Sequence, residues 1–384
     1  MSVTDLSRPG RPIVPWRRVK YIRSVDQIPQ LSPEERDQLR PVTQKYALRT
    51  NDYYLDLIDW DDPDDPIRRI VIPCPGELGR WGRLDASGEA TVTVAPGVQH
   101  KYPHTVLLLS NEVCGAYCRY CFRKRLFMRG NEEVANDLSE GIRYIAEHPE
   151  VTNVLVSGGD PLLMSTRRLR SLIEGLRAIP HVRIIRIGSK MPAFDPFRIL
   201  DDAELLDLFR AHSTPRNRIY LMTHFDHPRE LTEEAVAAID AVIRNGVICA
   251  NQCPLIAGIN DDPEVLAELY RELSFIGCPP YYLFQCRPTV GNEPYAVPLV
   301  RGWQVFREAL RRGSGLARRP RYVMSHALGK IEIVGVEDED ILLRFHRAKN
   351  PAHLGKLMRY VRDDSAFWLD DLVPADGGVA GDCD

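Results

Sequence analysis

The chain has 384 residues, of which 44% are hydrophobic and 27% charged, values that are ordinary for a globular protein of one large domain or two. Fifty basic and 53 acidic residues leave a formal charge of −3, so charge gives no case for binding nucleic acid or a membrane surface. No apolar run is long enough to span a membrane, and residues 1–16 lack the apolar core of a signal peptide. These features predict a cytoplasmic protein.

The first hundred residues differ from the rest of the chain. Ser32–Arg40 is charged and helix-like, Asn51–Asp65 is rich in Tyr and Asp, and several prolines cluster nearby. This stretch lacks the regular alternation of strands and helices that follows it. Residues 1–100 are therefore predicted to form an accessory segment that packs against the main domain.

Residues 101–330 alternate between strand-like and helix-like segments. Six short apolar runs rich in Val, Ile or Leu have the pattern of strands buried on both faces. These runs are Thr105–Ser110, Asn153–Ser157, Arg183–Gly188, Arg218–Thr223, Val247–Gln252 and Pro280–Gln285.

Helical patterns separate these strands. Leu172 and Leu176 share one helical face before Pro180 ends the run, and Thr232 and Asp262 are predicted N-caps. Six strand–helix units in a row predict a parallel sheet with right-handed crossovers, and six are too few to close an eight-stranded barrel. The prediction is an α/β fold, a partial (β/α)6 barrel that stays open.

The last segment, residues 331–384, is predicted to be a short C-terminal cap. Lys330–Val334 and Ile341–Phe345 are strand-like, and they are expected to cover the open side of the barrel. A Gly/Asp-rich tail begins near Ala375 and is predicted to be disordered.

Three cysteines follow the first predicted strand. Cys114, Cys118 and Cys121 have the spacing C-x3-C-x2-C, with Tyr120 before the last of them. Three thiolates hold three irons of a cubane cluster and leave the fourth iron open for a small ligand. A structural zinc site commonly uses two separate cysteine pairs, and nine cysteines without a secretory signal argue against disulfides. An iron–sulfur cluster is preferred, with zinc and inert thiols as the alternatives.

Polar residues end every predicted strand. In barrel-like α/β folds the carboxyl ends of the strands meet at one rim, where ligands bind. Ordinary loop starts are the alternative, but six such ends in succession favour an active-site rim. They are Asn111–Cys121, Gly158–Pro161, Ser189–Lys190, Thr223–Pro228, Asn251–Gln252 and Gln285–Arg287.

The cysteine motif resembles the signature of radical S-adenosylmethionine (SAM) enzymes. Over roughly Gln44 to Lys330 the chain is similar to the lysine 2,3-aminomutase family of these enzymes. The similarity rests on separate motifs, among them Tyr-Cys-Arg-x-Cys, Ser-Gly-Gly-Asp-Pro-Leu-Leu, Arg-Ile-Gly-Ser and Thr-His-Phe-x-His-Pro. Members combine a [4Fe-4S] cluster and SAM with pyridoxal 5′-phosphate (PLP), and they move an α-amino group to the β-carbon. The resemblance implies the same isomerase activity here.

The resemblance also implies roles for single residues. Cys114, Cys118 and Cys121 would ligate the cluster. Arg123 would bind the substrate's α-carboxylate, a two-pronged task that favours Arg over Lys, although a solvated surface arginine is the alternative. The residues that would lie along SAM are Gly158, Gly159, Asp160 and His224.

Lys330 is the residue that would anchor PLP. It follows Gly329 after Ser325–Leu328, where the family has a glycine-rich loop and then a lysine. A lysine that opens a strand is usually solvated, so this assignment depends on the resemblance. Gln252 and Lys101 would hold the phosphate of PLP. Lys101 stands where the family has one arginine, and Thr105 replaces a second.

The substrate is where the chain departs from the family. Lysine-specific members pair the distal ammonium with two aspartates, and these positions are Arg287 and Ser325 here. An ammonium facing Arg287 would be repelled, whereas a distal carboxylate would find a matching donor there. L-glutamate is the predicted substrate, and Ser325, His326 or Asn292 are predicted to assist Arg287 in binding the distal carboxylate. The counter-interpretation is that Arg287 pairs with a protein acid such as Glu293, which would leave another amino acid as substrate.

Other functions stay open beside this one. The chain could be an L-lysine 2,3-aminomutase, a radical SAM enzyme that has lost PLP, or a non-enzymatic iron–sulfur module. Only Cys383 lies in the tail, where zinc-binding members carry several cysteines, so no structural zinc is predicted. The family's chemistry implies an electron donor such as flavodoxin or ferredoxin, and a homo-oligomer is left open.

Overall fold

A sheet of twelve strands dominates the computed structural model, which describes residues 18–128, 131, 133–135 and 137–375. The polar amino terminus, Cys383 and the tail after Ala375 lie outside the described residues. The strands are β3 Thr93–Ala95, β4 Val98–Tyr102, β5 Thr105–Asn111, β6 Asn153–Gly158, β7 Ile184–Ser189, β8 Arg218–Thr223, β9 Ile248–Leu255, β10 Pro280–Gln285, β11 Arg321–His326, β12 Gly329–Glu337, β13 Asp340–Ala348 and β14 Leu357–Val361.

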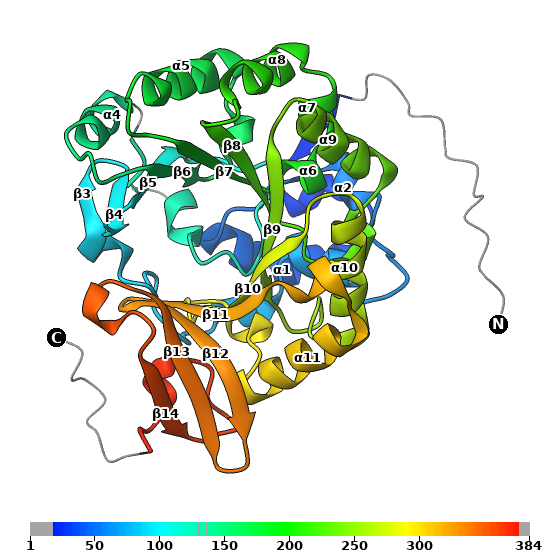
Figure 1. The fold of residues 1–384 in the computed structure, drawn as a ribbon. Helices are drawn as coiled ribbons and strands as arrows, with labels where there is room; N and C mark the ends of the chain where they lie inside the picture. The colour runs from blue at the N-terminus through cyan, green and yellow to red at the C-terminus, as the bar shows by residue number, and fades with distance from the viewer. Residues whose placement is uncertain (1–17, 129–130, 132, 136, 376–384) are drawn as a thin grey trace.

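The strands follow one another across the sheet in chain order. Strands β5 to β11 are parallel, and antiparallel strands extend both edges, β3 and β4 on one side and β12 to β14 on the other. The sheet curves around a central space with its helices outside, and β3 and β14 are its two edges (Figure 1). This arrangement is the open α/β barrel that the sequence predicts.

The helices are short and mostly cover the outside of the sheet. Thr232 and Asp262 are the N-caps of α9 and α10, as predicted, and each side chain accepts a hydrogen bond from the first helical turn. The helices are α1 Pro33–Lys45, α2 Asp52–Leu55, α3 Pro66–Val71, α4 Ser139–Ala146, α5 Thr166–Arg177, α6 Met191–Phe194, α7 Phe197–Leu200, α8 Ala203–His212, α9 Glu233–Arg244, α10 Pro263–Phe275 and α11 Leu299–Arg312.

The six predicted strands are confirmed as β5 to β10, with small shifts at their ends. The prediction missed the seventh parallel strand, β11, and the loop assigned to Ser325–Leu328 is wrong, because Ser325 and His326 end that strand. Arginines flank β11, so its sequence resembles a basic surface patch rather than a buried strand. Its central residues Tyr322, Val323 and Met324 are nevertheless fully buried between β10 and β12.

Side chains of the parallel strands alternate between two faces. Ile185 and Ile187 of β7 are fully buried in the hydrophobic core, whereas Arg186 and Gly188 line the central space. The sequence of such a strand is largely apolar, because polar groups occur only on the face that lines the central space.

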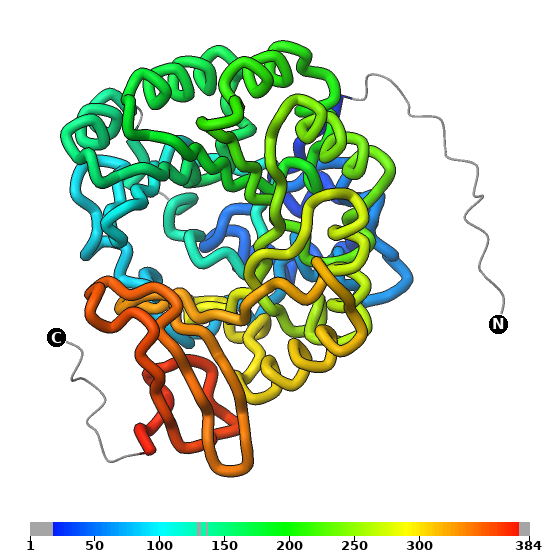
Figure 2. Tube along the Cα trace, in the orientation of Figure 1, coloured from blue at the N-terminus to red at the C-terminus, as the bar shows by residue number. Residues whose placement is uncertain are grey.

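The N-terminal segment forms a second hydrophobic cluster. Ile28, Tyr54 and Ile70 pack there against Tyr120 from the cysteine loop and Phe194 from α6. In addition, β1 (Tyr21–Ile22) pairs with β2 (Thr50–Asn51). The blue N-terminal tube lies against the barrel, far from the red C-terminal strands (Figure 2).

Polar side chains bridge the opening between the two edges of the barrel. Lys101 of β4 donates to the carbonyl of His326, Ser87 Oγ donates to the Ser325 carbonyl at 3.0 Å, and Arg347 of β13 donates to Thr105 Oγ1 at 3.2 Å. The C-terminal strands therefore approach β4 and β5 through side chains rather than by strand pairing.

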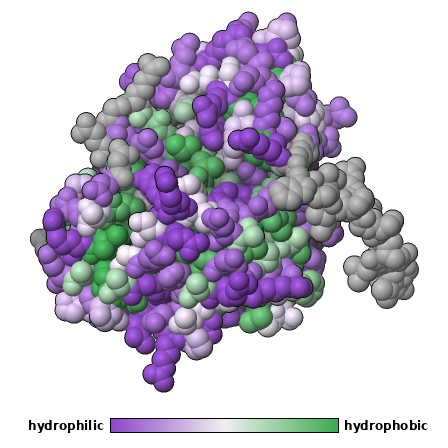
Figure 3. Space-filling model, turned by 90° about the horizontal axis from the view of Figure 1, so that it is seen from above, coloured by the Kyte–Doolittle hydropathy of each residue, from purple (hydrophilic) through white to green (hydrophobic). Residues whose placement is uncertain are grey.

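The outer surface gives no sign of a membrane-spanning element. No helix among the described residues is long and apolar enough to cross a bilayer. Seen from above, hydrophilic side chains cover most of the surface, and the apolar ones form separate patches (Figure 3).

Candidate active site

A cavity of about 380 Å³ occupies the inside of the barrel. The predicted ligands of the cluster, SAM, PLP and the substrate carboxylates line it, although these residues are spread over more than two hundred positions of the chain. The parallel sheet brings them together because each follows or lies on a different strand. They are Cys114, Cys118, Cys121, Gly158, Gly159, Asp160, His224, Gln252, Lys101, Arg123, Arg287, Ser325 and Lys330.

The three cysteines lie on the loop that leaves the carboxyl end of β5. Each is half-buried, and burial raises the pKa of Cys114, Cys118 and Cys121. No set of three or more His, Cys, Asp or Glu side chains among the described residues is arranged around one metal ion. A cubane takes each thiolate at a different iron, and three thiols on one cavity wall fit that ligand set.

The N-terminal segment holds this loop in place. The amide of Tyr117 donates to the Arg49 carbonyl and that of Arg119 to the Ile70 carbonyl, both at 2.9 Å. The guanidinium of Arg119 pairs with Glu77 at 2.7 Å, and both side chains are almost fully buried. The cysteine loop is thus held from outside the barrel by an ion pair that was not predictable from the sequence.

Gly158 and Gly159 are required by the backbone itself. Gly158 has a φ of +123°, and a Cβ at either position would lie 2.5 Å from a backbone oxygen of the cysteine loop. The glycines therefore let the end of β6 lie against the start of that loop. Asp160 follows them, and its two oxygens accept from the amides of Leu162 at 3.0 Å and Lys190 at 2.8 Å. Burial raises the pKa of Asp160 to about 6.

A buried ion network lies beside the cysteines and was not predicted from the sequence. Lys190 Nζ contacts Asp226 at 2.5 Å and Glu230 at 2.7 Å, and His224 Nε2 lies 3.0 Å from Asp226. The hydroxyl of Tyr120 donates to Asp226 as well. Burial opposes the charge of Lys190, but the two carboxylates outweigh it and raise its pKa. His224, the predicted SAM neighbour, is therefore oriented by Asp226.

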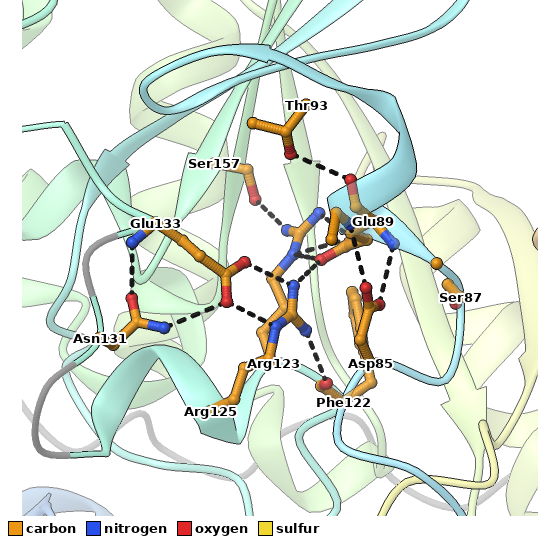
Figure 4. Close-up of polar contacts among 12 residues, drawn as sticks. Asp85, Ser87, Glu89, Thr93, Phe122, Arg123, Arg125, Asn131, Glu133 and Ser157 are labelled. Carbon is orange, nitrogen blue, oxygen red and sulfur yellow. Dashed lines mark hydrogen bonds and ion pairs between the residues drawn. The ribbon is translucent and has the colours of Figure 1, made fainter.

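Glu89 lies beside Arg123, a predicted substrate-binding residue, and beside Arg125 (Figure 4). Arg123 donates to Oε1 of Glu89 at 2.7 Å through Nη2 and to Oε2 at 3.1 Å through Nε, and Arg125 donates to Oε2 at 2.6 Å. Nη1 of Arg123 contacts the hydroxyl of Ser157 at 3.1 Å. Burial would raise the pKa of Glu89, but Arg123, Arg287 and Arg125 outweigh it and lower that pKa.

Arg287 lies at the same wall without a close ion pair. Its guanidinium stacks 3.5 Å from the centroid of the Phe122 ring, and its Nη1 is 3.9 Å from Glu89. The counter-interpretation is that Arg287 pairs with a protein acid such as Glu293. The acid beside it is Glu89 rather than Glu293, at the long distance of 3.9 Å. Burial lowers the pKa of Arg287 to about 10. Nη1 is buried without a hydrogen-bond partner among the described residues, as expected of a group that awaits a ligand.

Two of the three residues predicted to assist Arg287, Asn292 and His326, are not among those that line the cavity. Asn292 donates to the Tyr120 carbonyl at 2.8 Å, and His326 lies 3.1 Å from Asp370. Ser325 does line the cavity, at the end of β11.

Lys330 projects from β12 over the rings of Tyr282 and Phe284, with Nζ 4.9 Å and 4.4 Å from their centroids. Burial lowers the pKa of Lys330 well below its usual value, and Arg287 and Arg347 lower it further. A neutral amine in a cavity is the form that attacks a carbonyl group. Lys330 therefore fits the requirement for a covalent PLP anchor.

Two arginines that were not predicted as site residues, Arg186 and Arg347, also line the cavity. Arg186 could have been predicted from the sequence as a cavity residue, because an arginine inside an apolar strand must face a polar interior. No comparable sequence pattern marks Arg347 or Glu89 as residues that line the cavity.

Comparison with known proteins agrees with this architecture. Residues 108–270 match the model of the radical SAM superfamily. The chain is 54% identical over 358 residues to a putative L-lysine 2,3-aminomutase of Aquifex aeolicus, an alignment that covers 93% of this chain and 96% of that protein. It is 36% identical to the L-lysine 2,3-aminomutase of Acetoanaerobium sticklandii, over 77% of this chain and 71% of that protein.

A relative with another substrate in its name matches at a similar level. The glutamate 2,3-aminomutase of Clostridioides difficile is 31% identical over 81% of this chain and 73% of that protein. The length and level of these matches, together with the barrel and its cysteine loop, establish that the chain belongs to the lysine 2,3-aminomutase family of radical SAM enzymes.

Proposed function

We propose that the protein is a PLP-dependent radical SAM 2,3-aminomutase that converts L-glutamate to β-glutamate. The proposal that glutamate is the substrate rests on the charge of the cavity wall. Among the described residues, two acidic side chains line the cavity, Glu89 and Asp160, and both are already paired or hydrogen-bonded. Seven basic side chains line it, namely Lys101, Arg123, Arg186, Lys190, Arg287, Lys330 and Arg347.

This charge pattern favours a substrate with two carboxylates. Arg123 presents Nη1 to the neutral hydroxyl of Ser157, a partner that a carboxylate would replace with a stronger, charge-assisted bond. Arg287 has an unpaired buried nitrogen for a second carboxylate. The ammonium of lysine would instead meet Arg287 with no free acid in reach, which costs several kcal/mol for a desolvated charge.

The chain's residues prepare the site rather than carry out the bond chemistry. When bound, the cluster with SAM supplies a hydrogen-abstracting radical, and PLP supplies the electrophilic carbon for amino-group migration. The lowered pKa of Lys330, caused by burial and by Arg287 and Arg347, favours the neutral form of its amine. Arg123 and Arg287 orient the substrate, and the aromatic rings of Phe122, Tyr282 and Phe284 keep water from the reacting carbons.

The names of the relatives point to two different substrates, which keeps lysine as the second candidate. The names of the Aquifex and Acetoanaerobium proteins favour lysine, and that of the Clostridioides protein favours glutamate. Loss of PLP with retention of radical SAM activity is the remaining alternative. A small flavin or iron–sulfur protein is the proposed electron donor in each case.

The substrate is tested by product analysis with anaerobically reconstituted enzyme, SAM, PLP and dithionite. Glutamate, aspartate and lysine are offered separately, and we expect β-glutamate from glutamate and little turnover of lysine. Arg287→Met should reduce kcat/KM for glutamate roughly 100-fold, because it removes a charged hydrogen bond and its orientation. Conversion of lysine but not glutamate would overturn the substrate proposal.

PLP is tested separately by visible absorbance. Lys330→Ala should abolish the band of lysine-linked PLP and retain the iron–sulfur absorbance. Absence of any such band in the unmodified enzyme would support the alternative without PLP.

A further inference from the structure

Arg347 and Arg186 form a cationic group in the part of the cavity farthest from the cysteines. Thr105 and Asn153 open strands β5 and β6, so both lie at the amino ends of the parallel strands. Arg347 Nη2 donates to Thr105 Oγ1 at 3.2 Å, and Arg186 Nε donates to Asn153 Oδ1 at 2.9 Å. The cysteine loop leaves the opposite, carboxyl end of β5. The cavity therefore has two chemically different ends.

Neither arginine pairs with a carboxylate in the part of the chain that the structure describes. Their hydrogen-bond partners are a hydroxyl and an amide, both neutral, and each guanidinium keeps further N–H donors. Arg347 also lies over the Tyr102 ring, 4.0 Å from its centroid. Most other arginines near the site, such as Arg119 and Arg123, have a close acid. Two half-buried cations on the cavity wall without an acid favour the binding of an anion from outside the chain.

The charge and position of this group indicate a phosphate. Lys330 and Arg347 are directly paired neighbours across β12 and β13, so their side chains project on the same side of the sheet. A phosphate monoester carries close to two negative charges, which two guanidiniums balance, whereas a carboxylate would leave one of them uncompensated. The substrate arginines, Arg123 and Arg287, are grouped around Glu89 instead.

Lys101 is poorly placed for the phosphate role that the sequence predicted. Its ammonium donates to the His326 carbonyl, and the charged groups that act on it most are Arg287 and Glu89. The Lys101 ammonium is thus already engaged by a backbone carbonyl, whereas Arg347 and Arg186 keep free donors.

We propose that Arg347, assisted by Arg186, binds the phosphate of PLP, and that Arg347 does so from a C-terminal strand in place of an arginine on β5. The inference rests on the proposed use of PLP. Thr105 would then position Arg347 through its hydroxyl, and Asn153 would position Arg186 in the same way.

The test compares PLP with pyridoxal, which lacks the phosphate. Full-length enzyme with its cluster is freed of PLP, and each compound is titrated while the visible band of the lysine-linked form is followed. Arg347→Gln should weaken PLP binding roughly 10- to 100-fold more than it weakens pyridoxal binding, because a lost charged hydrogen bond affects only the phosphate compound. Loss of the positive charge beside Lys330 acts on the amine and therefore affects both compounds alike. Arg347→Lys should lose less.

Arg344→Gln is the matched control. Arg344 lies on the same strand, but its guanidinium pairs with Glu332 at 2.6 Å and does not line the cavity. This variant should bind both compounds as the unmodified enzyme does. Retained iron–sulfur absorbance shows that each variant is folded.

Two results would overturn the proposal. Equal weakening of PLP and pyridoxal in Arg347→Gln would give Arg347 a structural role only, and unchanged binding of both would remove it from the site. Failure of the unmodified enzyme to link either compound is a different outcome, because it rejects the use of PLP itself.

Discussion

Glu89 shows how one buried residue sets the electrostatics of the site. Its carboxylate is shared by Arg123 and Arg125 at 2.7 and 2.6 Å, with Arg287 at 3.9 Å. Without it, three guanidiniums would face one another in a region with little water, an arrangement that costs several kcal/mol. Glu89 therefore permits a strongly basic wall to exist before a substrate arrives.

The pKa of Lys330 depends on burial and on nearby cations, among them Arg287. Burial is the largest cause of its lowered pKa, and Arg287 is the largest contribution from a neighbouring charge. Because the charged ammonium is disfavoured, the amine loses its proton at a lower pH than an exposed lysine does. Attachment of PLP requires the neutral amine, so attachment should extend well below the usual lysine range.

We predict that Arg287→Met raises the pKa of Lys330 and moves the pH midpoint of PLP attachment upward. Removal of a neighbouring positive charge stabilises the ammonium, so a higher pH is needed to deprotonate it. The midpoint is read from the visible band across a pH series. Lys349→Met is the control, because Lys349 acts on Lys101 rather than strongly on Lys330. An unmoved midpoint in Arg287→Met would contradict the assigned coupling.

The cysteine loop depends on elements outside the barrel. Its backbone bonds to the carbonyls of Arg49 and Ile70, and the 3-10 helix Pro75–Leu78 supplies Glu77 for the buried pair with Arg119. Glu77 also accepts from the hydroxyl of Tyr295 at 3.2 Å. A loop held at several points can present three thiols in fixed positions, which a cluster requires.

We predict that Glu77→Gln lowers the iron content of the protein while its overall fold remains. Loss of one partner of a buried ion pair costs about 3–5 kcal/mol, and here the cost falls on the loop that carries the cysteines. Iron per chain and the iron–sulfur absorbance measure the effect. Glu35→Gln is the matched control, since it removes an ion pair with Arg68 on the same segment that is partly exposed. Equal iron in both variants would show that the Glu77 pair does not support the loop.

At the scale of the whole molecule, the barrel and the C-terminal strands share one hydrophobic core. Trp368 and Leu372, which follow β14, belong to the same buried cluster as Val154 of β6 and Ile185 of β7. Hydrogen bonds across the opening of the barrel, from Ser87 to Ser325 and from Arg347 to Thr105, also connect the C-terminal strands to the barrel. The C-terminal strands are therefore expected to unfold together with the barrel.

We predict that Trp368→Ala lowers the temperature of one common unfolding transition. Truncation of a buried tryptophan costs about 3–5 kcal/mol, and a shared core spreads that cost over the barrel. Calorimetry measures the transition, and Trp303→Ala at a half-buried position should shift it less. A separate early transition of the C-terminal strands would show that they are an independent unit.

Much of the barrel could be predicted from the sequence. Strands buried between helices read as apolar runs, and caps such as Thr232 and Asp262 mark helix starts by local chemistry. Strand β11 could not be found in this way, because its burial arises from β10 and β12 rather than from its own composition. The cysteine motif likewise stands in one short stretch of chain, so its spacing alone indicated the cluster.

The sequence by itself determined the alternation of strands and helices in the barrel, the cysteine motif, and most of the residues that line the cavity. Tertiary structure alone decided the partners of those residues. Glu89, Arg186 and Arg347 come from three distant segments, and nothing local relates them to Arg123 or Lys330. Their charges act through space across a cavity with little water, so their effect depends on the fold that brings them together.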